Sequence, residues 1–324
     1  MKRLISFIIT FIFFGAIFCF VLLSEHQNAT HESAISNEME QDGQGNYIHE
    51  PIAEQNYYQY NALNDLEKTI YDELNRAVRK FDRSVQLNSY HCSGDMVVKV
   101  YAALMADYPQ YFFLTKNCSY VYDPNKQSVK KILLTYTDGT TTDQYDAKGN
   151  RVSTANRTVI TDKIHTFDSM ISEVIKRIPT NSSELEKEKI IYKFIQSHVT
   201  YDMQAAALVD DPNGIQVPHA YDVYGAMCEK NAVCEGYAKL FQYLCYCVGI
   251  NSTVVLGTSS GDPHMWNCVE IDSKWYMLDV TWDDCGKENL YCYRYFNLTE
   301  SQMSENHSAD YSVLKVPSCI SKTD

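Results

Sequence analysis

Three short stretches decide how this chain folds: AVCEGYA at residues 232–238, HMWN at residues 264–267 and WYMLDVTW at residues 275–282. Each carries one side chain suited to covalent chemistry: a thiol in the first, an imidazole in the second and a carboxylate in the third. The first stretch predicts the start of a helix, and the other two predict neighbouring strands. A helix-borne thiol facing a strand-borne imidazole and carboxylate is typical of acyl transfer through a covalent intermediate.

The three side chains predict distinct chemical roles. Cys234 is the candidate nucleophile. A free thiol is only slightly ionised near neutral pH, so it needs a neighbouring base and gains from the partial positive charge of a helix N-terminus. His264 is the candidate base. Asp279 is the candidate orienter, which fixes the tautomer of the imidazole and stabilises its protonated form.

A helix is predicted around the thiol. It starts near Asn231, so that Cys234 falls in its first turn, and Gly249 stands where a helix C-cap glycine would. Gly236, which has no side chain, is expected to leave the thiol open to approach. The prediction rests on apolar residues at helical spacing: Val233, Tyr237, Leu240, Phe241, Leu244 and Val248.

The two stretches after the helix predict a β-hairpin. Apolar and polar residues alternate before Asp272-Ser273, and aromatic and β-branched residues follow it. A two-residue turn there makes His264 and Asp279 diagonal neighbours on one face of the ladder, within reach of a hydrogen bond. A shift of one residue in register would put them on opposite faces.

Other interpretations of these residues stay open. Asp283 or Asp284 could replace Asp279 as the partner of the imidazole, although the hairpin parity favours Asp279. Cys234, taken alone, could be a buried structural thiol. Tyr224 is a candidate donor to an oxyanion beside the backbone N–H of Cys234, but a packed tyrosine is the simpler interpretation.

Residues 221–284 resemble the transglutaminase-like superfamily, and in particular its bacterial and fungal cytokinesis-type members. The likeness rests on the three stretches quoted above, on Tyr224-Gly225-Ala226 and on DVTWDD at residues 279–284. The resemblance implies an α+β fold with a papain-like core, in which the helix that carries the cysteine packs on an antiparallel sheet. It also implies the nucleophile, base and orienter roles for Cys234, His264 and Asp279.

Composition limits the classes of partner. The chain has 324 residues, of which 45% are hydrophobic, enough for one large or two modest domains. Its net charge of −13 argues against nucleic acid and against an anionic membrane surface as the main partner. No phosphate-binding loop or zinc-type spacing stands out, and the chemistry of a thiol, an imidazole and a carboxylate needs no cofactor and no metal.

The N-terminus predicts a membrane anchor. Lys2 and Arg3 precede residues 4–23, a run of twenty residues without a charge. Such a run is long enough to span a bilayer as a helix, and the basic flank predicts that the rest of the chain faces outside the cytoplasm. Cleavage of this segment as a signal peptide, giving a secreted protein, is the alternative. Residues 24–56 are polar and predict a flexible stalk.

Two further regions follow. Residues 57–160 predict a small α+β region, with helices over 63–81 and 97–105 and a hairpin signal at Asp138-Gly139. Residues 161–324 then form the expected catalytic domain. Outside the cytoplasm cysteines can pair, and a bond between Cys285 and Cys292 would close a short loop.

These observations predict an extracytoplasmic cysteine acyl-transfer enzyme that acts on a peptide or protein amide through a thioester. Transamidation and hydrolysis both stay open, because likeness of fold does not decide the acceptor. Cell-envelope peptides and proteins are candidate substrates, and membrane contact is expected through the N-terminal helix only. A module of the same fold that binds or shapes the cell envelope without catalysis is the alternative.

Overall fold

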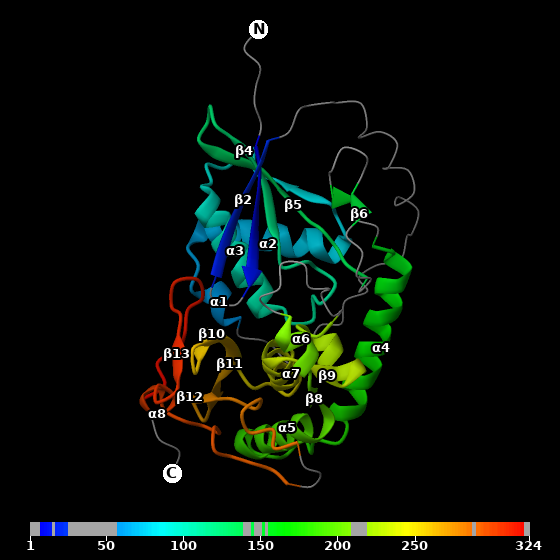
Figure 1. Ribbon diagram of the computed structural model, residues 1–324, viewed down its shortest axis with the longest axis vertical. Coiled ribbons are helices and arrows are strands. Elements are labelled where there is room, and N and C mark those ends of the chain that lie inside the picture. Colours follow the sequence, from blue (N-terminus) through cyan, green and yellow to red (C-terminus); the bar gives the residue numbers. More distant parts are fainter. Residues whose placement is uncertain are drawn as a thin grey trace.

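The computed structural model describes residues 7–14, 17–24, 57–138, 144–145, 151–152, 155–208, 219–286 and 290–320. A sheet with two long helices forms one half, and a second sheet packed around a central helix forms the other (Figure 1). The stalk expected at residues 24–56 lies, apart from Ser24, outside the described residues. The fold is mixed α+β, as the sequence predicts.

The first sheet has five antiparallel strands in the order β2-β1-β4-β5-β3. Strands β4 and β5 form a hairpin that turns just after Asp123, whose Oδ1 accepts the backbone N–H of Asn125 at 3.0 Å. The hairpin predicted at Asp138-Gly139 stays a prediction, because Gly139 lies outside the described residues, while Asp138 accepts the N–H of Asn156. The strands are β1 (Phe7–Phe14), β2 (Ile17–Ser24), β3 (Ser84–Gln86), β4 (Cys118–Asp123) and β5 (Ser128–Leu133).

Strands β1 and β2 occupy the run in which the sequence predicted a transmembrane helix. They pair with each other from Phe7–Ser24 to Phe14–Ile17, and β1 also pairs with β4. A long apolar run has no periodicity that separates a helix from a strand, and residues such as Phe, Ile and Val favour strands. None of the helices among the described residues combines the length and the apolar character needed to cross a membrane.

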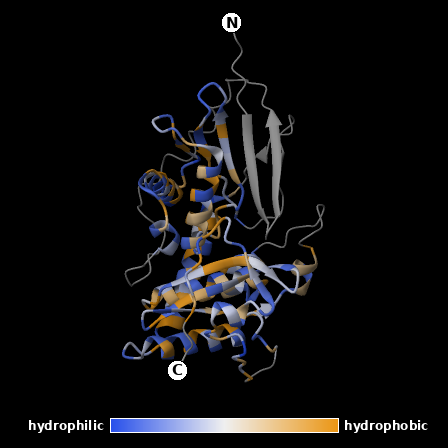
Figure 2. Ribbon diagram, turned by 90° about the vertical axis from the view of Figure 1, so that its left-hand side faces the viewer, coloured by the Kyte–Doolittle hydropathy of each residue, from blue (hydrophilic) through white to orange (hydrophobic). Residues whose placement is uncertain are grey.

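Three helices accompany this sheet. The two longer ones match the predicted helices to within three residues at each end. In α2, Asn64 and Glu67 form a capping box at the start, and the apolar side turns toward the core (Figure 2). The helices are α1 (Tyr58–Asn61), α2 (Asp65–Lys80) and α3 (Gly94–Asp107). A short antiparallel pair, β6 (Gln144–Tyr145) and β7 (Arg151–Val152), precedes the next helix.

The central helix of the second half is α7 (Cys234–Cys247). Gly249 follows it with a φ of 80°, the left-handed conformation that the C-cap prediction requires. Helices α4 and α5 and strands β10 and β11 contact α7, so it is buried along most of its length. The other helices here are α4 (Arg157–Ile175), α5 (Glu184–His198), α6 (Met203–Ala207), a π-helix η1 (Gly225–Glu229) and α8 (Glu300–Met303).

The second sheet has the order β12-β11-β10-β13, with antiparallel neighbours. Asp272 and Ser273 form the turn of its β11–β12 hairpin with φ values of 50° and 62°, as a two-residue hairpin turn requires. The pairing Ile271–Lys274 to Asn267–Leu278 is the predicted register. The strands are β10 (Ser252–Ser259), β11 (Asp262–Ile271), β12 (Lys274–Leu278) and β13 (His307–Ala309).

One hydrophobic core runs through both halves. Phe112 from the first half packs on Phe167 of α4, with ring centroids 5.8 Å apart, and Phe167 packs on Tyr243 of α7 at 5.1 Å. Helix α4 starts at Arg157 and passes through the boundary suggested at residue 160. The division into 57–160 and 161–324 therefore stays a prediction.

Candidate active site

Cys234 is the first residue of α7. The helix begins three residues later than predicted, because Asn231–Ala232 forms strand β9 and pairs in parallel with β8 (Thr200–Tyr201). Val233 is the extended N-cap residue. The Cys234 side chain is partly exposed, and it lies at the positive end of the helix dipole.

Gly236 serves close packing, and its expected part in access to the thiol stays a prediction. A Cβ at this position would lie 2.6 Å from the Cβ of Ala232 and 3.0 Å from the carbonyl oxygen of Asp222. Asp222 also holds the turn before η1, because its Oδ1 accepts the N–H groups of Tyr224 and Gly225 at 2.9 and 3.0 Å. The glycine thus lets the chain before η1 pass directly over the first turn of α7.

His264 and Asp279 meet as the hairpin register predicts. The Nε2 atom of His264, on β11, lies 2.7 Å from Oδ2 of Asp279, which follows the last residue of β12. Cys234 lies close enough to His264 to help raise the pKa of its imidazole. Since Nε2 faces the carboxylate, Nδ1 is the ring nitrogen left for the thiol. The three candidate residues therefore lie together, while their catalytic roles stay predictions.

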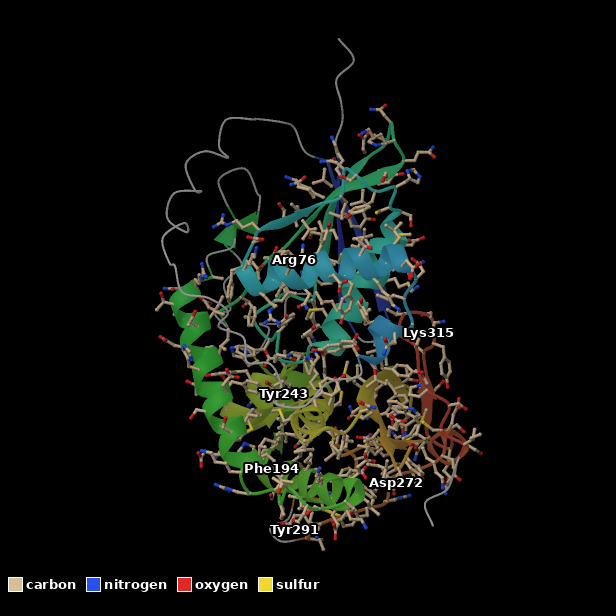
Figure 3. The ribbon with its side chains drawn as sticks, turned by 180° about the vertical axis from the view of Figure 1, so that it is seen from behind. Arg76, Phe194, Tyr243, Asp272, Tyr291 and Lys315 are labelled. Atoms are coloured by element: carbon tan, nitrogen blue, oxygen red, sulfur yellow. A yellow bond between two sulfur atoms is a disulfide. The ribbon has the colours of Figure 1, made fainter. Side chains whose placement is uncertain are left out.

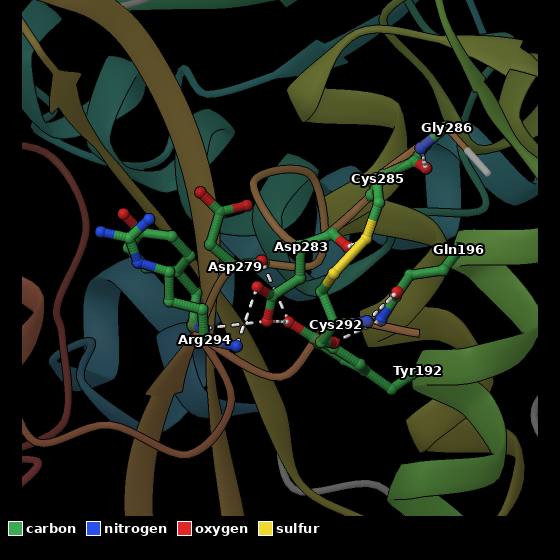
Figure 4. The surroundings of a disulfide bond; sticks show 10 residues. Tyr192, Gln196, Asp279, Asp283, Cys285, Gly286, Cys292 and Arg294 are labelled. Atoms are coloured by element: carbon green, nitrogen blue, oxygen red, sulfur yellow. Dashed lines mark hydrogen bonds between the residues drawn. A yellow bond between two sulfur atoms is a disulfide. The ribbon is translucent and has the colours of Figure 1, made fainter. Parts of the chain in front are cut away.

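The two alternative carboxylates have other partners. Asp283 accepts the hydroxyl of Tyr192 at 2.7 Å and the backbone N–H groups of Arg294 and Tyr295 at 2.9 and 2.8 Å (Figure 4). These bonds fix the loop after β12, in which the predicted bond between Cys285 and Cys292 is formed.

Asp284 likewise points away from the imidazole. Its Oδ2 accepts the hydroxyl of Tyr237 at 2.6 Å, and its Oδ1 accepts the N–H of Gly286 at 2.9 Å. Among the described carboxylates of the hairpin and of the loop after it, Asp279 is thus the one that pairs with His264.

His307 is a member of the cluster that the sequence did not suggest. Its Nε2 lies 3.0 Å from Oδ2 of Asp279, and its Nδ1 lies 2.6 Å from Oδ1 of Asn306. It is buried and packs edge-on against Trp266, with ring centroids 5.0 Å apart. His307 stands on a three-residue strand, 28 residues beyond Asp279, so no local spacing links the two.

The contacts between His264 and Asp279 favour the charged form of both side chains. Burial would lower the pKa of His264, but its interactions with Asp279 and Cys234 raise it to about 10. Burial would likewise raise the pKa of Asp279, yet the hydrogen bonds with His264 and His307 hold it at about 2. A buried carboxylate and a protonated imidazole therefore coexist at neutral pH.

His264, Asp279 and His307 also have the composition of a metal site. Among the residues that the structure describes, the possible ligand atoms of these three side chains lie within 4.8 Å of one another. A zinc ion would need these atoms at about 2.0–2.2 Å from itself. Here both imidazoles instead form hydrogen bonds with the same carboxylate oxygen of Asp279. A metal would therefore have to displace these two hydrogen bonds.

The first half of the chain reaches the site through Lys116. Its ammonium group forms an ion pair with Glu235, the residue after Cys234, and lies 4.8 Å from the ring centroid of Tyr221. Lys239 binds the other carboxylate oxygen of Glu235 at 2.8 Å. Burial would raise the pKa of Glu235, but the two lysines hold it below its usual range.

Tyr224 has the packed position that its simpler interpretation predicts. Its ring lies 5.0 Å from that of Phe112 and 4.7 Å from that of His219, and the Lys163 ammonium lies 5.0 Å from its centroid. Its role as an oxyanion donor stays untested.

Three comparisons place this site among known proteins. Residues 172–280 match the family described as the transglutaminase-like superfamily. Kyphoscoliosis peptidase from Homo sapiens is 25% identical over 176 residues, 48% of this chain and 25% of that protein. The Mus musculus protein is 25% identical over 178 residues, 48% of this chain and 26% of its own length. This chain thus spans about a quarter of the length of these relatives.

A solved structure described as "Crystal structure of a TGase" is 23% identical, with a TM-score of 0.35 over 44% of this chain and 37% of that one. The sequence match over residues 172–280 includes the cysteine, the histidine and the aspartate that meet in the structure. Over residues 172–280, which hold these three residues, the chain is thus similar to the transglutaminase-like superfamily.

Proposed function

We propose that the chain is a cysteine acyl-transfer enzyme in which Cys234 is the nucleophile, His264 the acid and base, and Asp279 the residue that orients the imidazole. The observation that carries the proposal is the 2.7 Å contact between His264 and Asp279 beside a thiol at the first residue of a helix. A cysteine with a purely structural role would need neither the imidazole nor the carboxylate beside it.

The arrangement supports a defined sequence of steps. The Cys234 thiolate attacks the carbonyl carbon of an amide, and the carbonyl electrons move to the oxygen. Backbone N–H groups at the start of α7, including that of Cys234, are candidate donors to this oxyanion. Collapse forms the thioester and expels the amine, which takes a proton from the His264 imidazolium. An amine or water, deprotonated by His264, then attacks the thioester and releases the thiol.

Peptide or protein amides are the proposed substrates. The name of the curated relatives, Kyphoscoliosis peptidase, favours a peptide amide. Either an amine or water can attack a thioester, so transamidation and hydrolysis both stay within the proposal. Proteins of the cell envelope are the candidate partners.

We also propose that the chain acts outside the cytoplasm, either held at the membrane or secreted. The bond between Cys285 and Cys292 favours an oxidising compartment, and the basic residues Lys2 and Arg3 before an apolar run favour export. Protease treatment of intact cells tests this. The proposal fails if residues 57–320 stay protected until the cells are lysed.

The deciding experiment incubates the full chain with a glutamine peptide and a primary amine and follows both products by mass spectrometry. Transamidated or hydrolysed peptide should form with the natural chain and not with Cys234→Ala. A thiol-directed activity probe runs in parallel. A chain that turns over no amide and leaves Cys234 unlabelled would instead be the non-catalytic envelope module.

A further inference from the structure

Residues 313–320 form a strap over the second sheet. Lys315 lies beside helix α1 (Figure 3). The Gln59 side chain of α1 binds both backbone groups of Lys315: its Nε2 donates to the carbonyl oxygen at 2.8 Å, and its Oε1 accepts the N–H at 2.9 Å. Leu314 is buried against Val254 and Met265. The strap thus ties the first half of the chain to the second sheet.

Near its end the strap brings Cys319 to Cys268 of β11. Their sulfur atoms lie 3.5 Å apart, and both side chains are fully buried. Cys268 is held on both sides, because it pairs with Thr253 of β10 and Met277 of β12. Cys319 is held by its carbonyl oxygen, which accepts the N–H of Glu300 at 2.7 Å. Chain segments 51 residues apart therefore present two thiols to each other.

We propose that Cys268 and Cys319 form a second disulfide that staples the strap to β11. A disulfide has an S–S distance of about 2.05 Å, so the sulfurs need to approach by only about 1.5 Å. Cys268 lies in the middle of a sheet, so the movement falls to Cys319 at the end of the strap. The inference rests on the oxidising location in the proposed function and not on catalysis itself.

The bond forms by thiol–disulfide exchange with an external disulfide, such as oxidised glutathione or a disulfide oxidoreductase. One thiolate attacks the external disulfide, forms a mixed disulfide and expels one reduced thiolate. The second thiolate then attacks the sulfur of the first cysteine and expels the other. The two protons lost by the cysteine thiols go to the two leaving thiolates, so the external disulfide is reduced to two thiols. Because both sulfurs are buried, the exchange takes place before the strap docks.

The staple closes a loop of chain that contains the orienting groups of the site. Asp279 and His307 both lie between residues 268 and 319. Cys268 and Cys319 also pack in one small apolar cluster with Trp266, whose ring lies 6.0 Å from His264 and 5.0 Å from His307. The disulfide would therefore restrain the apolar cluster around Trp266, against which both imidazoles pack.

The test maps the cysteines of the full chain expressed in its exported form. Free thiols are alkylated in intact cells and during denaturing lysis, and the non-reduced peptides are then analysed by mass spectrometry. A peptide pair joined through Cys268 and Cys319 is expected, beside the pair joined through Cys285 and Cys292. Cys118, buried and free among the side chains that the structure describes, should be alkylated and serves as the control.

Alkylated Cys268 and Cys319 would overturn the inference, whatever the state of Cys285 and Cys292. An activity probe for Cys234 is scored on the same material. A joined pair with an inert Cys234 would contradict the proposed catalysis alone. A reactive Cys234 with two free thiols at Cys268 and Cys319 would contradict the staple alone.

A second measurement compares Cys319→Ser with Cys118→Ser, which also removes one buried thiol. Without reductant, thermolysin should cut the strap several-fold faster in Cys319→Ser than in the natural chain or in Cys118→Ser. With reductant, the natural chain should be cut as fast as Cys319→Ser. Equal rates for all three proteins without reductant would also contradict the staple.

Discussion

The Nε2 atom of His307 lies 3.0 Å from Oδ2 of Asp279, the same oxygen that His264 contacts at 2.7 Å. The other oxygen, Oδ1, accepts the N–H groups of Thr281 and Trp282 at 2.9 and 3.2 Å. The carboxylate therefore has partners at both oxygens and little freedom to rotate. We therefore propose that His307 is a positioning residue, which acts on the candidate base through Asp279.

We predict that His307→Gln lowers kcat by about threefold to tenfold and leaves KM nearly unchanged. One hydrogen bond contributes about 0.5–1.5 kcal/mol, and its loss lets the Asp279 carboxylate turn away from His264. His198→Gln is the control, because His198 is a partly buried histidine that contacts the carbonyl oxygen of Met227 and not Asp279. Equal kcat values for the two variants, at equal thermal stability, would remove His307 from the positioning scheme.

Asp279→Asn and Asp283→Asn should fail in different ways. The first keeps the shape of the side chain but removes the charge that stabilises the imidazolium, so turnover should fall on the order of 10²–10⁴-fold. The second disturbs the three donors that converge on Asp283, so it should lower the unfolding temperature while the folded fraction stays active. Steady-state kinetics and thermal unfolding of both variants separate the loss of turnover from the loss of stability. A crippled but stable Asp283→Asn would reverse the assignment.

The sequence predicts the hairpin well because its determinants are local. The turn at Asp272-Ser273 sets the register, and the register alone brings His264 to Asp279. Helix α7 starts three residues later than the sequence predicts because residues 231–232 form a strand pair with residues 200–201, and no local pattern reveals that pairing.

Two features could not be predicted from local sequence patterns: the contact of His307 with Asp279, and the structure of the apolar run at residues 4–23. His307 enters the cluster only when β13 joins the far edge of the sheet, which is a property of the whole fold. The apolar run of residues 4–23 is uniform, so its pattern cannot separate one membrane-spanning helix from the strand pair β1 and β2. Its length alone favoured the helix.

The rate of acylation should fall as the pH rises through about 10. The pKa of His264 is raised to about 10, so its imidazolium is present below that pH and loses its proton above it. The leaving amine needs that proton, so the protonated form is the active one for acylation. Single-turnover acylation rates measured from neutral to strongly alkaline pH would show this limb.

In Asp279→Asn the alkaline limb should move to lower pH. The variant loses the charge and the hydrogen bond that raise the pKa of His264, while burial continues to lower it. Lys99→Met, which alters an ion pair with Glu67 in the first half of the chain, should leave the limb in place. An unshifted limb in Asp279→Asn would mean that another group donates the proton.

Lys116 gives the last prediction, because it joins the first half of the chain to the residue beside the nucleophile. Lys116→Met keeps most of the side-chain length but leaves Glu235 with Lys239 as its remaining cationic partner in the contacts described above. We expect a loss of stability of about 1 kcal/mol, since the lysine is partly exposed, together with a severalfold lower kcat as the first turn of α7 loosens. Thermal unfolding and kinetics measure the two effects.

Lys99→Met is the matched control for this prediction as well. Lys99 binds the buried Glu67 at 2.8 Å and is exposed to a similar extent, but its ion pair lies within the first half of the chain. It should cost comparable stability and no activity. If both variants lower kcat equally, the loss reflects general destabilisation, and Lys116 has no specific hold on the first turn of α7. If Lys116→Met alone lowers kcat, and Glu235→Gln added to it causes little further loss, the ion pair carries the effect.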